Sequence, residues 1–214
     1  MENSINNNLK WDRHLFHLIA GSFTPLVGFV FSWNLAIFIA SFSFLILISF
    51  EILRFKYESV NLIVINFLSL LLKDGEKRKI TAATYLAFIS VVILLIFRSQ
   101  PVIGGLALFY ISIGDPVAAI VGIKFGKTVL FRGSGTLKTP QNGKTIEGSI
   151  AFVSVTLLIA YLIWSKGAYE NFTAAAIGAI TAAVVEFLPI PLDDNIRVPL
   201  ISSIVMYFLW NISF

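Results

Sequence analysis

The sequence predicts an all-α membrane protein with about seven transmembrane helices and one amphipathic helix at the membrane interface. Hydrophobic residues make up 57% of the 214 residues and charged residues only 13%, whereas an ordinary soluble domain has roughly 25% charged residues. Several apolar segments have a length close to the about 20 residues that a helix needs to cross a bilayer. Lys and Arg residues also concentrate in alternate loops between these segments, a distribution typical of membrane proteins.

The candidate spans lie at approximately 15–32, 34–54, 81–97, 101–123, 148–165, 171–188 and 197–213. A further apolar stretch at 60–72 is shorter and carries Asn61, Asn66 and Ser69 at rough helical spacing. This stretch favours an amphipathic helix lying at the interface rather than a span. The chain has no tandem repeat and no low-complexity segment, so residues 1–214 are expected to form a single polytopic domain.

With a cytoplasmic N-terminus, all but two of the sixteen Lys and Arg residues fall on the inner side, the exceptions being Arg98 and Lys166. This positive-inside bias predicts a multi-pass integral membrane protein whose N-terminus and active site face the cytoplasm and whose C-terminus lies outside. The polar start of the chain, Met1 to Lys10, lacks the pattern of a cleavable signal peptide. The first apolar segment is therefore expected to remain as a helix.

The chain contains no cysteine, which excludes disulfides and Cys-ligated metals. A bound metal would need oxygen or His ligands, and carboxylates favour Mg²⁺ or Ca²⁺. The formal net charge of +4 is explained by the basic inner loops, so no nucleic-acid partner is expected.

The segment 114–149 stands out because it is glycine-rich and basic between two apolar runs. Its part at about 124–147 is expected to be a cytoplasmic loop, in which freed backbone N–H groups and cationic side chains can cradle phosphate. The pattern is neither a Walker A loop nor a dinucleotide-binding fingerprint, and a flexible linker would look similar. The candidate nucleotide-binding residues of this segment are Gly114, Gly122, Gly126, Lys127 and Thr145.

Two carboxylates flank this loop. Asp115 follows an apolar run, and a charge at membrane depth costs about 2.5 to 3.5 kcal/mol unless it meets a partner, metal or water. It is either functional or a structural residue paired to a neighbouring helix. Glu147 lies in Lys144-Thr145-Ile146-Glu147-Gly148, where Thr145 is a candidate N-cap. Glu147 would suit a metal or a base, or would simply favour the helix start.

A second acidic group lies near the C-terminus. Glu186 closes the sixth predicted span and Asp193-Asp194-Asn195 opens the seventh, with Pro189 and Pro191 between them. Prolines hold this connection extended and fix where the acidic residues point. Successive oxygen-bearing side chains at a helix start favour a Mg²⁺–nucleotide site.

Two further pairs of charged or polar residues are spaced for one helix face. Arg13 and His17, four residues apart, could contact phosphate or could anchor the helix at the interface beside Trp11. Glu51 and Arg54, three residues apart, are expected to pair with each other.

Taken in order, these elements resemble the polyprenol kinase family, which comprises dolichol kinase, phytol kinase and CTP-dependent diacylglycerol kinase. The matching runs are Arg13-x-x-x-His17 with Gly21, Lys79-Ile80-Thr81, Gly114-Asp115-Pro116-Val117-Ala118-Ala119-Ile120-Val121-Gly122 with Phe125-Gly126-Lys127, Gly143-Lys144-Thr145-Ile146-Glu147-Gly148-Ser149, and Glu186 with Asp194-Asn195-Ile196-Arg197-Val198-Pro199-Leu200. The resemblance covers nearly the whole chain. In place of the Lys that usually follows Arg13 in the family, this chain has His14.

The resemblance implies an isoprenoid or lipid kinase that transfers the γ-phosphoryl group of CTP to the hydroxyl of a membrane lipid alcohol, with Mg²⁺ or another divalent cation such as Ca²⁺. The alcohol is a polyprenol or dolichol, phytol, geranylgeraniol or diacylglycerol. Phosphoryl transfer needs charge neutralisation and an oriented hydroxyl. The expected roles are phosphate contact by Arg13, His17, Lys127 and Lys144, metal binding by Asp115, Asp194 and Asn195, and catalysis by Asp115, Glu147, Glu186 and Lys144.

Two other functions compete with this interpretation. A phosphatidate cytidylyltransferase would also use CTP and a membrane lipid, but the chain lacks the Lys-Asp and Asp-Arg signature that this family carries near its C-terminus. A small transporter would use Asp115 and Glu186 as an ion path, but two corresponding half-repeats with broken helices are not visible.

Overall fold

The computed structural model describes residues 11–67, 79–132 and 143–210, and almost all of them are helical. The elements are α2 (Trp11–Val30), α3 (Trp33–Lys56), α4 (Glu58–Phe67), α5 (Ala82–Ile96), α6 (Pro101–Phe125), β1 (Val129–Arg132), β2 (Gly143–Thr145), α7 (Ile146–Ser165), α8 (Phe172–Phe187) and α9 (Asp194–Trp210). Each predicted span corresponds to one helix, and the predicted all-α membrane class is confirmed, while the number of spans stays a prediction.

The helix ends differ from the predicted ones by a few residues. Helix α2 begins at Trp11 and so includes Arg13 in its first turn. Helix α4, from Glu58 to Phe67, lies where the interfacial helix at 60–72 is predicted, and residues 68–72 lie outside the described ranges. Its position at the membrane interface stays a prediction. Asp194 opens α9, as the sequence predicts, and Ser32, Thr81, Thr145 and Asn171 cap the helices that follow them. Short polar side chains at these positions satisfy N–H groups that a helix start leaves free.

The outer surface of the bundle is apolar, which identifies a membrane protein. Three of the described helices, α3, α6 and α7, are long and apolar enough to cross a membrane, and α5 and α8 are shorter apolar helices. Phe38, Phe42 and Leu45 on α3 are exposed. A soluble protein rarely presents a continuous apolar surface of this kind, whereas lipid chains cover it without cost.

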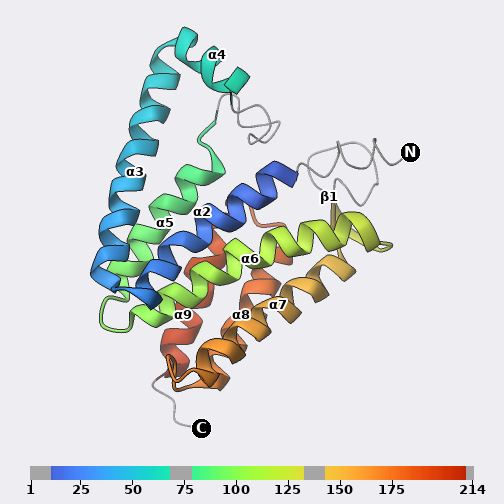
Figure 1. The fold of residues 1–214 in the computed structure, drawn as a ribbon. Helices are drawn as coiled ribbons and strands as arrows, with labels where there is room; N and C mark the ends of the chain where they lie inside the picture. Colours follow the sequence, from blue (N-terminus) through green and yellow to red (C-terminus); the bar gives the residue numbers. More distant parts are fainter. Residues whose placement is uncertain (1–10, 68–78, 133–142, 211–214) are drawn as a thin grey trace.

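Helix α6 is the central element, with α2, α7 and α9 packed along it (Figure 1). Leu106, Leu108 and Ile111 on α6 are fully buried. The Tyr110 hydroxyl donates a hydrogen bond to the Ala175 carbonyl at 2.9 Å, which ties α6 to α8. A helix surrounded in this way holds its polar side chains at fixed positions within the bundle.

Helices α6 and α7 pack closely because small residues lie where they meet. A Cβ atom at Gly148 would lie 2.8 Å from the backbone oxygen of Ala118, and one at Gly122 would lie 2.8 Å from Oγ1 of Thr145. Small residues of this kind allow membrane helices to approach each other. The close contact fixes the start of α7 against the end of α6.

A short antiparallel strand pair, which the sequence did not predict, precedes α7. Val129 pairs with Thr145, Phe131 with Lys144 and Arg132 with Gly143, with an irregularity between Val129 and Phe131. The predicted basic glycine loop is therefore partly ordered by backbone hydrogen bonds. Residues 133–142 of this loop lie outside the described residues.

The connections between helices alternate between two sides of the bundle. Figure 1 places the α2–α3, α5–α6 and α7–α8 connections on one side, and the start of α2 together with β1 on the opposite side. The predicted topology requires this alternation. The orientation of the two sides relative to the cytoplasm stays a prediction.

Candidate functional site

Three carboxylates from three helices come together at one place. Asp115 lies within α6, Glu186 in the last turn of α8 and Asp194 at the first residue of α9. One carboxylate oxygen from each lies within 4.8 Å of those of the other two. Glu186 is buried, and the other two residues are half-buried. The sequence predicted functional roles for all three, and the structure brings them together.

Three carboxylate oxygens within 4.8 Å of one another form a candidate site for a divalent cation. Ligand oxygens lie about 2.0 to 2.1 Å from Mg²⁺ and about 2.3 to 2.6 Å from Ca²⁺, so these oxygens would move toward one another around a bound ion. Carboxylates are also the donors that these hard cations prefer. Asp115, Glu186 and Asp194 are therefore candidate ligands, and metal binding by this group stays a prediction.

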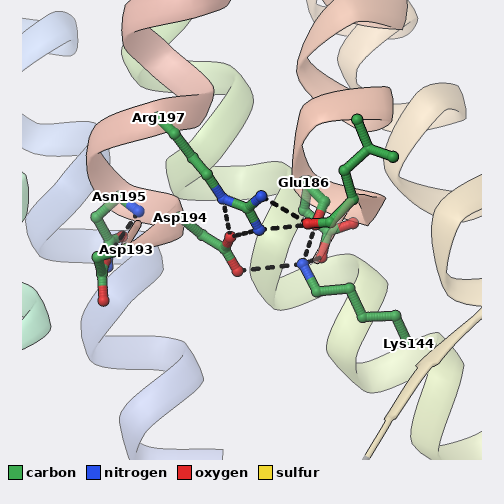
Figure 2. Close-up of polar contacts among 7 residues, drawn as sticks. Lys144, Glu186, Asp193, Asp194, Asn195 and Arg197 are labelled. Atoms are coloured by element: carbon green, nitrogen blue, oxygen red, sulfur yellow. Dashed lines mark hydrogen bonds and ion pairs between the residues drawn. The ribbon is translucent and has the colours of Figure 1, made fainter. Parts of the chain in front are cut away.

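Lys144 joins this group from strand β2 (Figure 2). Its Nζ lies 2.6 Å from Oε1 of Glu186 and 3.1 Å from Oδ2 of Asp194, and it also donates to the backbone oxygen of Glu186. The Lys144 side chain is 29% exposed. A partly exposed ammonium between two carboxylates is placed to meet an anionic ligand from the solvent side.

Arg197 completes the cluster from α9, one turn after Asp194. Its Nε donates to Oδ1 of Asp194 at 2.6 Å, a second nitrogen pairs with the same oxygen, and a third donates to the Leu188 carbonyl at 2.6 Å. The guanidinium also donates to the Glu186 carbonyl at 3.3 Å. Arg197 is 4% exposed, and the sequence alone did not predict a role for it. The signal was present, because a charge within a predicted span needs a partner and Asp194 is three residues away.

The connection between α8 and α9 places Glu186 and Asp194 side by side. Pro189 and Pro191 interrupt the helical pattern between them, as the sequence predicts. Oδ1 of Asp193 then accepts hydrogen bonds from the backbone N and from the side-chain nitrogen of Asn195, at 3.0 and 2.8 Å. Such local bonds define a turn at a helix start.

Asn195 is not brought into the carboxylate group. Its side chain is buried and bonded to Asp193, and Figure 2 draws these two residues apart from Lys144 and Glu186. Its contacts are those of a residue that stabilises the start of α9. A role of Asn195 as a metal ligand stays a prediction.

Thr145 and Glu147 fasten the end of α6 to the start of α7. Oγ1 of Thr145 accepts from the backbone N of Gly148 at 3.1 Å, which confirms Thr145 as the N-cap. Oε1 of Glu147 accepts from the backbone N of Lys127 at 3.0 Å. Glu147 is not one of the three clustered carboxylates among the described residues. Its predicted role as a base or metal ligand stays a prediction, and its observed contact is a structural one.

The three predicted nucleotide-binding glycines occupy crowded positions. A Cβ at Gly114 would lie 2.7 Å from the Phe152 ring, Gly122 faces Thr145, and a Cβ at Gly126 would overlap the backbone oxygen of Gly122. Packing against α7 and the residue that caps it accounts for Gly114 and Gly122, and Gly126 is confined by the last turn of its own helix. Nucleotide binding by these glycines stays a prediction. Lys127 is exposed just after the end of α6, and its backbone N–H donates to Oε1 of Glu147.

Arg13 and His17 lie on α2, which packs along the Asp115-bearing helix α6. Both are half-buried, and His14 between them is 5% exposed. Their predicted contact with phosphate stays a prediction.

The expected pair of Glu51 and Arg54 is confirmed, with both side chains buried and 2.5 Å between Arg54 and Oε2 of Glu51. Oε1 of Glu51 accepts from the Thr81 backbone N at 2.9 Å and from Oγ1 of Thr84 at 3.3 Å. Arg54 also donates to the Lys79 carbonyl. This group, called the α3–α5 latch below, joins the end of α3 to the start of α5.

Comparison with known proteins identifies similar chains. The chain is 30% identical over 152 residues to a probable chloroplastic phytol kinase of Triticum aestivum, and the match covers 65% of this chain and 48% of the relative. It is 33% identical over 141 residues to a probable chloroplastic phytol kinase of Oryza sativa subsp. japonica, with 60% and 42% covered. It is also 31% identical over 153 residues to an uncharacterized protein of Methanocaldococcus jannaschii, with 70% and 69% covered.

The chain spans about half the length of the plant relatives that it matches, at 48% and 42%. No family model matches the chain. No solved structure matches it either.

Proposed function

Because the chain belongs to the polyprenol and phytol kinase family, we propose that it is a membrane-embedded lipid kinase that transfers the γ-phosphoryl group of CTP to the hydroxyl of a lipid alcohol. The products are CDP and a lipid monophosphate. The two plant relatives carry the name of phytol kinases. Phytol, a polyprenol, geranylgeraniol and diacylglycerol all present one hydroxyl at the level of the lipid headgroups.

The observation that carries the proposal is the convergence of Asp115, Glu186 and Asp194 beside the ammonium of Lys144. Phosphoryl transfer depends on positioning and on neutralising phosphate charge rather than on covalent chemistry by the protein. The three carboxylates can position a metal ion or the lipid hydroxyl, and the Lys144 ammonium beside them can neutralise phosphate charge. The group is formed where α8 ends and α9 begins, so a lipid hydroxyl and a water-soluble nucleotide can meet there.

Asp115 and Asp194 would hold the divalent cation, because both are half-buried and carry carboxylate oxygens within 4.8 Å of each other. When bound, the cation would neutralise the phosphate charge that develops during transfer. Lys144 would release one of its carboxylate contacts and bind a phosphate oxygen, as its partial exposure allows. Arg13 and Lys127 are placed on the same side of the bundle by the predicted topology and would add phosphate contacts.

Glu186 would orient the lipid hydroxyl and accept its proton at a carboxylate oxygen. It is the most buried of the three carboxylates and lies in the last turn of α8. Glu147 is less suited to this step because its Oε1 already accepts from the Lys127 backbone. We further propose that this site faces the cytoplasm, where CTP is present, with the C-terminus on the other side.

The test uses the purified chain in detergent or nanodiscs, supplied in turn with phytol, a polyprenol, geranylgeraniol and diacylglycerol. Each reaction contains Mg²⁺ and CTP labelled in the γ position. The expected result is a labelled lipid monophosphate with release of CDP, and loss of product on addition of EDTA. Matched reactions with γ-labelled ATP measure the nucleotide preference.

Release of pyrophosphate with a CDP-lipid product would instead identify a cytidylyltransferase. Equal turnover with ATP and CTP would overturn the nucleotide assignment. A wild-type chain that phosphorylates none of the four alcohols would contradict the proposed activity.

A further inference from the structure

Arg197 and Lys144 contact the same two residues but are held very differently. Both bind a carboxylate oxygen of Asp194 and both donate to the backbone oxygen of Glu186. The Lys144 side chain is 29% exposed and that of Arg197 is 4% exposed. Two cationic side chains therefore bind the Asp194 carboxylate: that of Lys144 is partly exposed, and that of Arg197 is enclosed by protein.

The two oxygens of Asp194 are divided between these cations (Figure 2). Arg197 binds Oδ1 through two nitrogens, whereas Lys144 lies 3.1 Å from Oδ2. A planar guanidinium that binds one oxygen with two donors restricts the rotation of the carboxylate. Oδ2 consequently faces the Lys144 side, and the Asp194 side chain cannot turn away from Glu186 without breaking these bonds.

Arg197 also fixes the backbone that carries the two carboxylates. Its remaining donors bind the carbonyl oxygens of Leu188 and Glu186, at 2.6 and 3.3 Å. These carbonyls belong to the end of α8, where no helical N–H group follows to bind them. One side chain on α9 thus holds the end of α8 and the start of α9 in a single arrangement.

We infer that Arg197 is a positioning residue that holds Asp194 and the end of α8 so that the oxygens of Asp115, Glu186 and Asp194 face one another, while Lys144 is the exchangeable cation of the site. The inference rests on the proposed function only in assuming that the carboxylates receive a divalent cation. Groups that orient the ligands of a metal typically change its affinity by about 10- to 100-fold when they are removed.

The first experiment keeps the charge and changes only the geometry. Mn²⁺ is the probe, because it accepts the same oxygen ligands as Mg²⁺ and its binding to the purified chain can be followed by electron paramagnetic resonance. Arg197→Lys cannot make the forked contact to Asp194 and the carbonyls together, so its Mn²⁺ dissociation constant is expected to rise about tenfold. Lys144→Arg keeps the charge at the exposed position and is expected to bind Mn²⁺ within about threefold of wild type, a shift smaller than that of a lost orienting group.

The second experiment removes one positive charge in each of two variants. Lys144→Met takes away a cation that competes for the carboxylates, so Mn²⁺ binding is expected to tighten. Arg197→Met takes away the same charge but also releases Asp194, so Mn²⁺ binding is expected to weaken by about tenfold. If charge alone mattered, both variants would bind Mn²⁺ more tightly than wild type.

The control is Asp193→Asn, which alters the neighbouring carboxylate outside the cluster and should leave the Mn²⁺ affinity unchanged. Thermal melting on the same samples separates positioning from folding, because a purely structural Arg197 would lower the melting temperature and leave the affinity of the folded protein unchanged. Should Arg197→Met fail to fold, the comparison of Arg197→Lys with Lys144→Arg decides the question.

Wild-type affinity in Arg197→Lys, tighter binding in Arg197→Met, or no binding of Mn²⁺ by the wild-type chain would overturn the inference. Turnover of CTP by the wild-type chain is measured separately. A wild-type chain that binds Mn²⁺ as expected but phosphorylates no lipid would contradict the proposed function and leave the role of Arg197 standing.

Discussion

Lys144 and Glu186 form an ion pair with 2.6 Å between Nζ and Oε1, although 42 residues separate them in the chain. Lys144 comes from the strand that precedes α7, and Glu186 from the end of α8. The pair therefore docks the ordered part of the glycine-rich segment onto the carboxylate group. Two regions that the sequence marked separately belong to one site.

Asp115→Asn and Asp194→Asn should both lower turnover by about two orders of magnitude or more, because a lost electrostatic contact in a preorganised site costs about 2.7 to 4 kcal/mol. The two replacements should differ in their effect on the free energy of unfolding. Asp194 pairs with buried Arg197, so its replacement should also lower the free energy of unfolding by about 1 to 3 kcal/mol. Turnover and melting temperature are measured on the same purified samples.

The control for this pair is Asp193→Asn. Asp193 uses Oδ1 to accept from Asn195, and an Asn oxygen can accept the same bonds. Near-normal turnover and melting are expected. An Asp115→Asn or Asp194→Asn protein that folds well and turns over normally would remove that residue from the site.

The α3–α5 latch should contribute to stability and not to chemistry. Replacing either Glu51 or Arg54 alone with Met leaves a buried charge without its main partner, which costs about 3 to 5 kcal/mol. The double replacement with Met should cost less than the sum of the single changes. Thermal melting of the three variants measures this coupling, and turnover per folded molecule should stay close to that of wild type.

A different outcome would contradict this assignment. If Glu51→Met folds as well as wild type but loses its turnover, the pair acts in the reaction and is not only a latch.

Gly148→Ala should destabilise the protein because its added methyl group would lie 2.8 Å from a backbone oxygen of Ala118. Backbone atoms yield little, so overpacking here should cost about 1 to 3 kcal/mol. Gly178→Ala is the matched control, since its nearest neighbours are atoms of the unbranched and flexible Met206 side chain, which can move. A melting temperature of Gly148→Ala at or above that of Gly178→Ala would argue against close α6–α7 packing.

The predicted topology is tested by labelling single cysteines, since the native chain has none. Cysteines at Ser99 and Lys166 should react with an impermeant thiol reagent from outside intact cells, and one at Thr128 should react only after lysis. All three positions are exposed in the structure. The reverse labelling pattern would place the carboxylate group on the side away from cytosolic CTP.

The sequence by itself determined the helical membrane architecture and the local features of each helix. Apolar length gives the spans, Thr145 caps α7, Asp194 opens α9, and Glu51 meets Arg54 one turn away. These features depend on neighbours within about one helical turn, so they can be read from spacing alone. The functional candidates Asp115, Glu186, Asp194 and Lys144 were also visible, because charges are costly near apolar spans.

Only the tertiary structure decided which candidates meet. Helix packing brings Asp115, Glu186 and Asp194 together and adds Arg197, while the turn at Asp193 holds Asn195 aside and the Lys127 backbone holds Glu147. The packing of Gly122 and Gly148 and the pairing of β1 with β2 likewise depend on segments brought side by side. Spacing along one helix determines on which face of that helix a residue lies. Its partner on another helix depends on how the two helices pack, and no local sequence pattern specifies that packing.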